Sequence, residues 1–228
     1  MIDLFVFLDA ETSGLLRKEL PADDPAQPHL LQLAAKAVRV EFLSSVSAFL
    51  KDTKRTLGQF SLIVRPDGWE VEPGAERIHG ISTRLAAQVG VPCWLVLAQL
   101  KAMVANATRI IGHNLMGFDY QIIDLAIKRV GSDPAWWRGK TGILFDTMEH
   151  ATPIVRLPGQ FGDYKFPSLE EAVRFFGKDW SSRHDPADDV EACEFVFWQL
   201  AERRATPQEA ENPSTPRGKD AADTGESR

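Results

Sequence analysis

An acidic motif follows an apolar run near the start of this 228-residue sequence. Residues 4–8 are continuously apolar, and the letters DAETSG occupy positions 9–14. The run predicts a strand that is buried on both faces. Because side chains alternate along a strand, Asp9 and Glu11 would project from one face at its end. Acidic residues also end many ordinary strands, so this pair gains meaning only together with other carboxylates.

Two further carboxylates stand at the start of periodic segments. Asp119 and Asp189 each lie on the apolar stripe of a predicted helix, at its N-terminal end. A first-turn acid is favoured by the helix dipole, but the dipole does not explain why the acid is on the buried side. The stripes comprise Ile122, Ile123, Ala126, Ile127 and Val130 after Asp119, and Ala192, Cys193, Val196, Phe197 and Leu200 after Asp189.

If these four carboxylates converge, the folded chain needs counter-charges. Burying like charges without compensation costs many kcal/mol, and divalent cations remove that cost. A set of carboxylate oxygens suits Mg²⁺ or Mn²⁺. Two such ions, roughly 3.5–4 Å apart, assist in-line displacement at phosphorus. The pattern therefore predicts metal-dependent phosphoryl chemistry.

Three motifs in order resemble those of the DEDDh (DnaQ-like) 3′→5′ exonucleases. The family includes the proofreading subunit of DNA polymerase III, ribonuclease T and oligoribonuclease. DAETSG resembles its first motif, D-x-E-T-T-G, and HN at 113–114 with FD at 118–119 resembles its second. His184, five residues before Asp189, resembles its third, H-x-A-x-x-D. Segments at 75–82, 146–148 and 166–169 also match, so the resemblance covers about residues 2–204.

The resemblance implies a ribonuclease H-like fold and stepwise release of nucleoside 5′-monophosphates from a 3′ end. Two Mg²⁺ or Mn²⁺ ions would activate water and stabilise the leaving 3′ oxygen. His184 would act as the general base, since the pKa of histidine lies near working pH. The implied catalytic residues are His184, Asp9, Glu11, Asp119 and Asp189, and the last four are the implied metal ligands. The implied substrate-binding residues are Ala10, Thr12, His79, Asn114, Phe118 and His184.

Two positions depart from the family pattern. Ser13 replaces a threonine, which is a mild change. Pro186 stands where the third motif usually has alanine, and a shift of one residue there would disturb how His184 is aimed. Residues 15–29 and 41–59 are longer than the family minimum, and Lys36 interrupts an apolar strand.

The elements that must position these residues predict an α/β chain. Strands are expected at 4–8, 30–40, 60–64, 109–113 and 143–145, and helices at 83–89, 94–107, 118–130, 168–176 and 187–204. The first three strands, close in sequence, suit antiparallel pairing, and the later ones suit parallel pairing. The expected fold is a ribonuclease H-like three-layer fold, with a central mixed five-stranded sheet flanked by helices.

Composition predicts one exonuclease domain over residues 1–204 and a disordered polar tail over 205–228. The tail contains no Val, Ile, Leu, Met or aromatic residue, so it cannot bury enough apolar surface to order itself. It offers no apolar segment for docking a polymerase, although a polymerase partner stays open. No apolar run is long enough for a membrane span, and two cysteines exclude a disulfide scaffold. We expect a cytoplasmic protein.

The net charge of −6 decides little about nucleic acid, because bound cations would offset the acidic site. We favour single-stranded or frayed DNA as substrate, of the proofreading or repair type. An exoribonuclease of the ribonuclease T or oligoribonuclease type is the alternative. A non-catalytic nucleic-acid-binding module is a third reading, which leaves the retained acids unexplained. Residues with simpler interpretations are His113 as a local hydrogen-bonding residue, Trp136 and Trp137 as a packing pair, Lys51, Lys54 and Arg55 as a solvated loop, and Cys193 as core.

Overall fold

Five strands form one mixed sheet in the computed structural model, which describes residues 2–41, 54–160, 162–182 and 184–205. Their spatial order is β3-β2-β1-β4-β5. β1 pairs antiparallel with β2, and β2 with β3, whereas β1–β4 and β4–β5 are parallel. This confirms the expected mixed sheet. The strands are β1 (Ile2–Thr12), β2 (Leu30–Glu41), β3 (Lys54–Ile63), β4 (Arg109–Gly112) and β5 (Leu144–Asp146).

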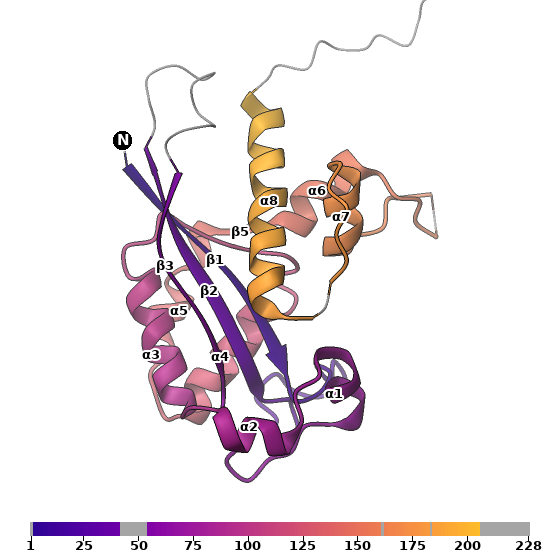
Figure 1. Ribbon diagram of the computed structural model, residues 1–228. Helices are drawn as coiled ribbons and strands as arrows, with labels where there is room; N and C mark the ends of the chain where they lie inside the picture. Colours follow the sequence, from indigo (N-terminus) through magenta and orange to yellow (C-terminus); the bar gives the residue numbers. More distant parts are fainter. Residues whose placement is uncertain (1, 42–53, 161, 183, 206–228) are drawn as a thin grey trace, which may run out of the picture.

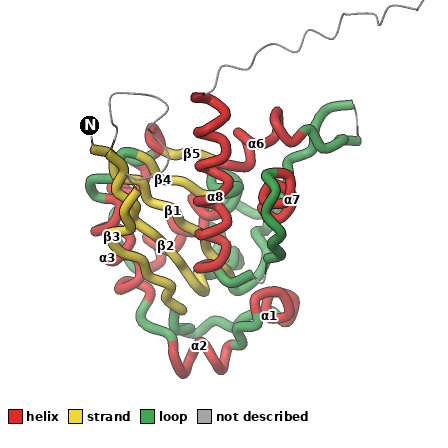
Figure 2. The backbone as a smooth tube through the Cα atoms, turned by 45° about the horizontal axis from the view of Figure 1, so that its top comes forward, coloured by secondary structure: helices red, strands yellow, loops and turns green. Residues whose placement is uncertain are grey.

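Helices cover both faces of the sheet and make three layers (Figures 1 and 2). α8 lies against β1, β2 and β4 on one face, with α6 and α7 beside it, and α3 and α4 pack on the other. The shorter α1 and α2 lie below the sheet in Figure 1. The helices are α1 (Pro73–His79), α2 (Thr83–Val89), α3 (Cys93–Val104), α4 (Asp119–Arg129), α5 (Ala135–Arg138), α6 (Thr147–Val155), α7 (Leu169–Phe175) and α8 (Pro186–Ala205), with a 3-10 turn, η2 (Thr141–Ile143).

Alternation along β1 aims its two acids at α8. Phe5 and Phe7 belong to the core under α8, whereas Val6 and Leu8 belong to the core under α3 and α4. The period of two continues past the apolar run, so Asp9 and Glu11 share the face of the two phenylalanines. Since β1 ends where α8 begins, this face carries both acids toward the first turn of α8 (Figure 1).

The position of Lys36 in an apolar strand is explained by its ion pairs with α8. Its side chain is 11% exposed, and its Nζ lies 2.6 Å from Glu191 Oε1 and 2.7 Å from Glu194 Oε2 on α8. Burial lowers the pKa of Lys36, but hydrogen bonds to Glu191 and Glu194 and the charges of both outweigh it, so the pKa is raised and the lysine stays charged. The ion pairs tie the N-terminal half of α8 to β2.

Some elements differ from the sequence predictions. β3 begins at Lys54, six residues before the expected start, because an edge strand with two exposed faces lacks an apolar run. Lys54 and Arg55 are therefore strand residues rather than loop residues, and Lys54 Nζ lies 4.2 Å from the centroid of the Trp198 ring. α1, α5 and α6 had no counterpart among the predicted helices.

Two expectations fall outside this structure. Lys51 and the tail from residue 206 lie beyond the described residues, so the expected solvated loop at Lys51 and the expected disorder of the tail stay predictions. In the part of the chain that is described, no helix has the length and apolar character needed to cross a membrane.

Candidate active site

The end of β1 and the start of α8 bring three of the predicted residues into direct proximity. One potential ligand atom from each of Glu11, His184 and Asp189 lies within 4.8 Å of the other two. His184 Nδ1 is 3.9 Å from Glu11 Oε1. Glu11 has a side chain that is 14% exposed, and Asp189 is buried. Residues about 175 positions apart in sequence therefore form one cluster, as the motifs predict.

The fourth carboxylate enters from α4, on the opposite face of the sheet. Asp119 is 2% exposed and heads a buried stripe of isoleucines, which confirms the predicted orientation. Its charge acts on Asp9, and Asp9 also experiences the charges of Asp189 and Glu11. Asp119 Oδ1 is buried and finds no hydrogen-bond partner among the described residues. An unpartnered buried carboxylate oxygen is unfavourable unless something else supplies a positive charge.

All four carboxylates are shifted toward their protonated forms. Burial, followed by the charges of Asp189 and Asp185, raises the pKa of Glu11 to about 8. Burial raises the pKa of Asp189 to about 6, although a hydrogen bond from Ser182 opposes the shift. Burial also raises the pKa of Asp9 and of Asp119 well above the ordinary range. The cluster is therefore short of positive charge when it is fully ionised.

This donor set fits divalent cations. Carboxylate oxygens are the ligands that Mg²⁺ and Mn²⁺ prefer. A cation would satisfy Asp119 Oδ1 and would offset the burial and the mutual repulsion that together raise the four pKa values. The residues that would hold it are Asp9, Glu11, Asp119 and Asp189.

The connector before α8 is held by two polar side chains that the sequence analysis did not assign to the site. Ser182 Oγ is 3.0 Å from Asp189 Oδ1, to which it donates, and it accepts from the His184 N–H at 3.0 Å. Asp185 accepts from the Ala187 N–H at 2.9 Å and so caps α8. One hydroxyl thus links the backbone of the histidine to the aspartate five residues later.

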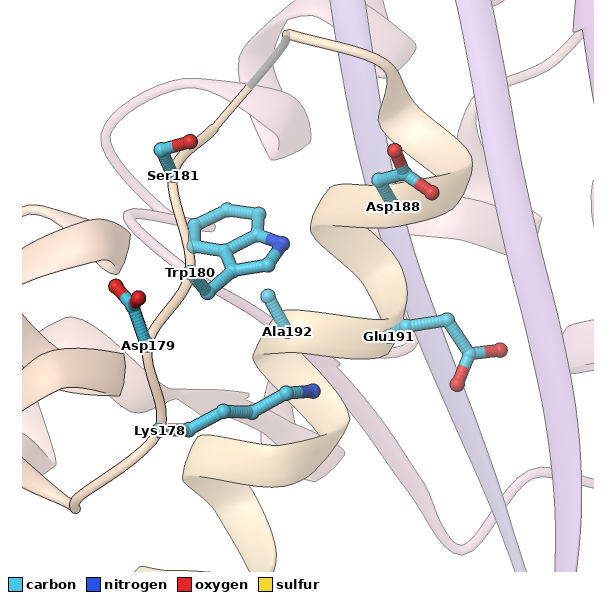
Figure 3. Close-up of a pocket in the computed structure, with 7 residues that line it drawn as sticks. All are labelled: Lys178, Asp179, Trp180, Ser181, Asp188, Glu191 and Ala192. Atoms are coloured by element: carbon cyan, nitrogen blue, oxygen red, sulfur yellow. The ribbon is translucent and has the colours of Figure 1, made fainter.

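Pro186 does not misdirect the histidine. It is the first residue of α8, a position where proline is favoured because its missing N–H would be unpaired in any case. His184 takes a left-handed backbone conformation with φ of 53°, and its ring still faces Glu11. Asp188, the neighbour of Asp189, is exposed and lines a hollow with residues outside the cluster (Figure 3).

His79 lies near enough to His184 for the charge of one ring to act on the other. Its Nδ1 accepts the Ile81 N–H at 3.1 Å, so the neutral ring carries its proton on Nε2. Burial lowers the pKa of His79, a hydrogen bond with the backbone of Thr12 opposes the shift, and the charge of His184 adds to it. His79 therefore lies against the first motif.

Thr12 is buried, and its hydroxyl donates to the Gly14 carbonyl at 2.7 Å. Ala10 is also buried, and its backbone contributes a hydrogen bond that favours ionised Asp119.

The second motif is shaped by a carboxylate from the neighbouring strand. Asp146, at the end of β5, accepts the N–H groups of Asn114 at 2.9 Å, Met116 at 3.3 Å and Met148 at 3.0 Å. Asn114 takes a left-handed conformation with φ of 63°. Phe118 is half-buried and packs against the core beside α4. In the sequence, the segment at 146–148 is only a supporting match to the family pattern.

His113 makes local hydrogen bonds, as expected. Its Nδ1 lies 3.0 Å from Thr147 Oγ1, and its Nε2 lies 2.9 Å from the Pro167 carbonyl oxygen. Both ring nitrogens are therefore occupied. This histidine fixes the segment before α7 against the end of β4.

A hollow of about 520 Å³ lies beside the third motif and not at the carboxylate cluster (Figure 3). It has three acids against one lysine, which disfavours a phosphate backbone. A smaller hollow of about 360 Å³ lies between α8 and strands β2 and β3. Neither one contains His184 or any of the four carboxylates. The larger one is lined by Lys178, Asp179, Trp180, Ser181, Asp188, Glu191 and Ala192.

Comparison with solved structures decides the fold class. The complex of E. coli Exonuclease I with a dT13 oligonucleotide aligns with a TM-score of 0.63 at 24% identity, over 89% of this chain and 42% of that chain. The fold is that of part of Exonuclease I. The zinc ion bound form of the Exonuclease I–ssDNA complex gives 0.63 at 24% identity, over 89% and 41%. The product-bound structure of exonuclease I gives 0.61 at 23%, over 88% and 43%.

The likeness to Exonuclease I confirms the ribonuclease H-like fold. At this level of identity it shows the fold alone, and this chain spans about two fifths of the length of the Exonuclease I chain. No protein-family model matches the chain, and a search of curated proteins gave no match.

Proposed function

We propose that this chain is a metal-dependent 3′→5′ exonuclease that acts on single-stranded nucleic acid. The observation that carries the proposal is the convergence of Asp119 and Asp189 with the two acids of β1, next to His184. A structural core gains nothing from four mutually repelling carboxylates. A site that binds divalent cations and cleaves phosphodiesters requires them.

In this proposal the residues of the site have three roles: metal binding, proton transfer and positioning. Asp9, Glu11, Asp119 and Asp189 hold the cations, which supply Lewis-acid activation of water and of the leaving 3′ oxygen when bound. His184 has a half-exposed side chain at the edge of the cluster, so it can take a proton from the attacking water and pass it to solvent. Ser182 keeps His184 and Asp189 in register.

The terminal nucleotide would lie between the first and second motifs. His79 presents its ring beside the backbone of Thr12, and Asn114 lies in the turn that leads to Phe118. The backbone of Ala10 and Thr12 completes this side of the site. His184 would then contact the scissile phosphate from the direction of α8.

DNA is the favoured substrate, and RNA is the alternative. The Exonuclease I structures are described as complexes with single-stranded DNA, which supports the DNA reading. A proofreading or repair role, two Mg²⁺ or Mn²⁺ ions and a domain confined to residues 1–204 are further parts of the proposal. Truncation after residue 204 should therefore leave nuclease activity intact.

The deciding experiment is a time course on a 5′-labelled single-stranded DNA oligomer with Mg²⁺ or Mn²⁺, read on a denaturing gel. We expect a ladder that shortens by one nucleotide at a time and stops in excess EDTA. Asp189→Asn should abolish it, whereas Asp188→Asn, the exposed neighbour on the same helix turn, should not. Internal cuts only, or equal activity in both variants, would contradict the proposal. A matched RNA oligomer in parallel decides the sugar preference.

A further inference from the structure

Between α6 and α7, residues 157–159 and 163–165 lie beside each other and are joined by backbone hydrogen bonds. The Gly159 N–H donates to the Asp163 carbonyl at 2.8 Å, and the Lys165 N–H donates to the Leu157 carbonyl at 3.0 Å. Pro158 and Tyr164 form an isolated antiparallel bridge. These contacts hold residues 164–166 in a fixed course. We refer to Arg156, Tyr164 and Phe166 as the aromatic hairpin.

Two large rings of this hairpin face solvent. Tyr164 is 49% exposed and Phe166 is 61% exposed. In an extended segment, residues two apart project to the same side and lie roughly 6.5 Å from each other. Single exposed aromatics are common, but two exposed rings at alternate positions of one short segment form a surface suited to flat partners.

The hairpin carries positive charge beside one ring. The Arg156 guanidinium carbon lies 6.0 Å from the centroid of the Tyr164 ring. Lys165 points elsewhere and is paired with Glu171 at 2.5 Å, so it does not add to this charge. An exposed arginine next to a stacking ring matches the phosphate and the base of a nucleotide.

The base of the hairpin is fixed to the second motif. The Pro167 carbonyl oxygen is 2.9 Å from His113 Nε2, and Asn114 follows His113 directly. The second motif also exposes Met116, at 42%. The segment that carries the two rings therefore adjoins the second motif through one hydrogen bond.

We propose that the aromatic hairpin binds the single strand upstream of its 3′ end, with Tyr164 and Phe166 stacking on bases. This inference rests on the proposed function, because it places the hairpin on the path of a strand whose 3′ end is at the carboxylate cluster. Stacking on a ring does not depend on base identity, so the surface strengthens binding of long strands without sequence preference.

The experiment compares long and short ligands. Affinity for fluorescein-labelled dT12 and dT2 is measured by anisotropy in the Asp189→Asn background, which prevents cleavage. Hydrolysis of the p-nitrophenyl ester of thymidine 5′-monophosphate is measured in the active protein. The variants are Tyr164→Ala and Phe166→Ala, and the control is Trp94→Ala, which removes an equally exposed ring on α3, across the sheet.

We expect each hairpin variant to weaken dT12 binding about 5- to 150-fold, the range of one lost base stack. Binding of dT2 and the rate of ester hydrolysis should stay within about twofold, and Phe166→Trp should restore dT12 binding. Unchanged dT12 affinity in both variants overturns the inference, as does an equal loss for dT12 and dT2. A wild-type protein that hydrolyses neither the ester nor any oligomer contradicts the proposed function instead, and the binding comparison still tests the hairpin.

Discussion

Replacing Glu11 with glutamine should stabilise the metal-free protein, and much more at pH 9 than at pH 5. The side chain is 14% exposed, and burial raises its pKa from 4.5 to about 8. In the folded protein Glu11 is therefore protonated at pH 5, whereas in the unfolded chain it ionises with its ordinary pKa. The contribution of protonated Glu11 to the free energy of unfolding is fully present below about pH 4.5, and it is lost as the pH rises through about 8.

The magnitude follows from the two pKa values. One pKa unit corresponds to about 1.4 kcal/mol, so ionised Glu11 lowers the free energy of unfolding by up to roughly 4–5 kcal/mol at pH 9. At pH 5 the same group lowers it by about 1 kcal/mol or less. Glutamine carries no charge at either pH. The gain from Glu11→Gln should therefore be larger by about 4 kcal/mol at pH 9.

The assay is urea denaturation of wild type and Glu11→Gln in EDTA at both pH values. Glu70→Gln is the control, since Glu70 is an exposed acid outside the cluster, and its effect should stay within about 0.5 kcal/mol. Adding Mn²⁺ should stabilise wild type at pH 9 more than it stabilises Glu11→Gln. A variant that loses stability at pH 9, or gains equally at both pH values, would refute the account of the cluster as an uncompensated set of charges.

Three further substitutions test how the site is supported. Ser182→Ala should lower kcat for ester hydrolysis about 10- to 100-fold while Ser182→Thr retains most activity, and urea denaturation should show little change for either. Lys36→Met should reduce the free energy of unfolding by about 2 kcal/mol, because the largely buried Glu194 keeps its hydrogen bond from Trp198 but loses its lysine counter-charge, and Lys36→Arg should recover most of it. Asp146→Asn should destabilise the protein by about 2 kcal/mol and raise KM for a DNA 3′ end. The reason is that one amide oxygen cannot accept the three N–H groups that the two carboxylate oxygens of Asp146 accept. An unchanged KM would contradict the positioning role of Asp146.

Several features of the site could be predicted because they depend on local periodicity. Asp9 and Glu11 share a face since β1 alternates, and Asp119 and Asp189 are buried since each heads an apolar stripe. The mixed pairing of the sheet followed from the lengths of the connections between strands. These properties depend on neighbours within a few residues, which the sequence displays directly.

Other features were missed because their partners are distant in sequence. Asp146 accepts an N–H from Asn114, 32 positions away, and no local pattern marks that contact. β3 starts early because pairing with β2, rather than an apolar pattern, makes Lys54 and its neighbours a strand. Pro153 lies inside α6, where proline disfavours a helix, yet the packing of α6 against α8 supports it.

The sequence by itself determined which side chains are candidates to carry the chemistry: four acids and a histidine, in motifs whose types and spacing are readable without coordinates. Only the tertiary structure decided how they are held. Ser182 links the two halves of the third motif, Asp146 shapes the second, and Lys36 ties α8 to the sheet. The reason is physical, since periodicity sets the direction of a side chain from its own backbone. A hydrogen bond between distant segments exists only after the core has brought them together.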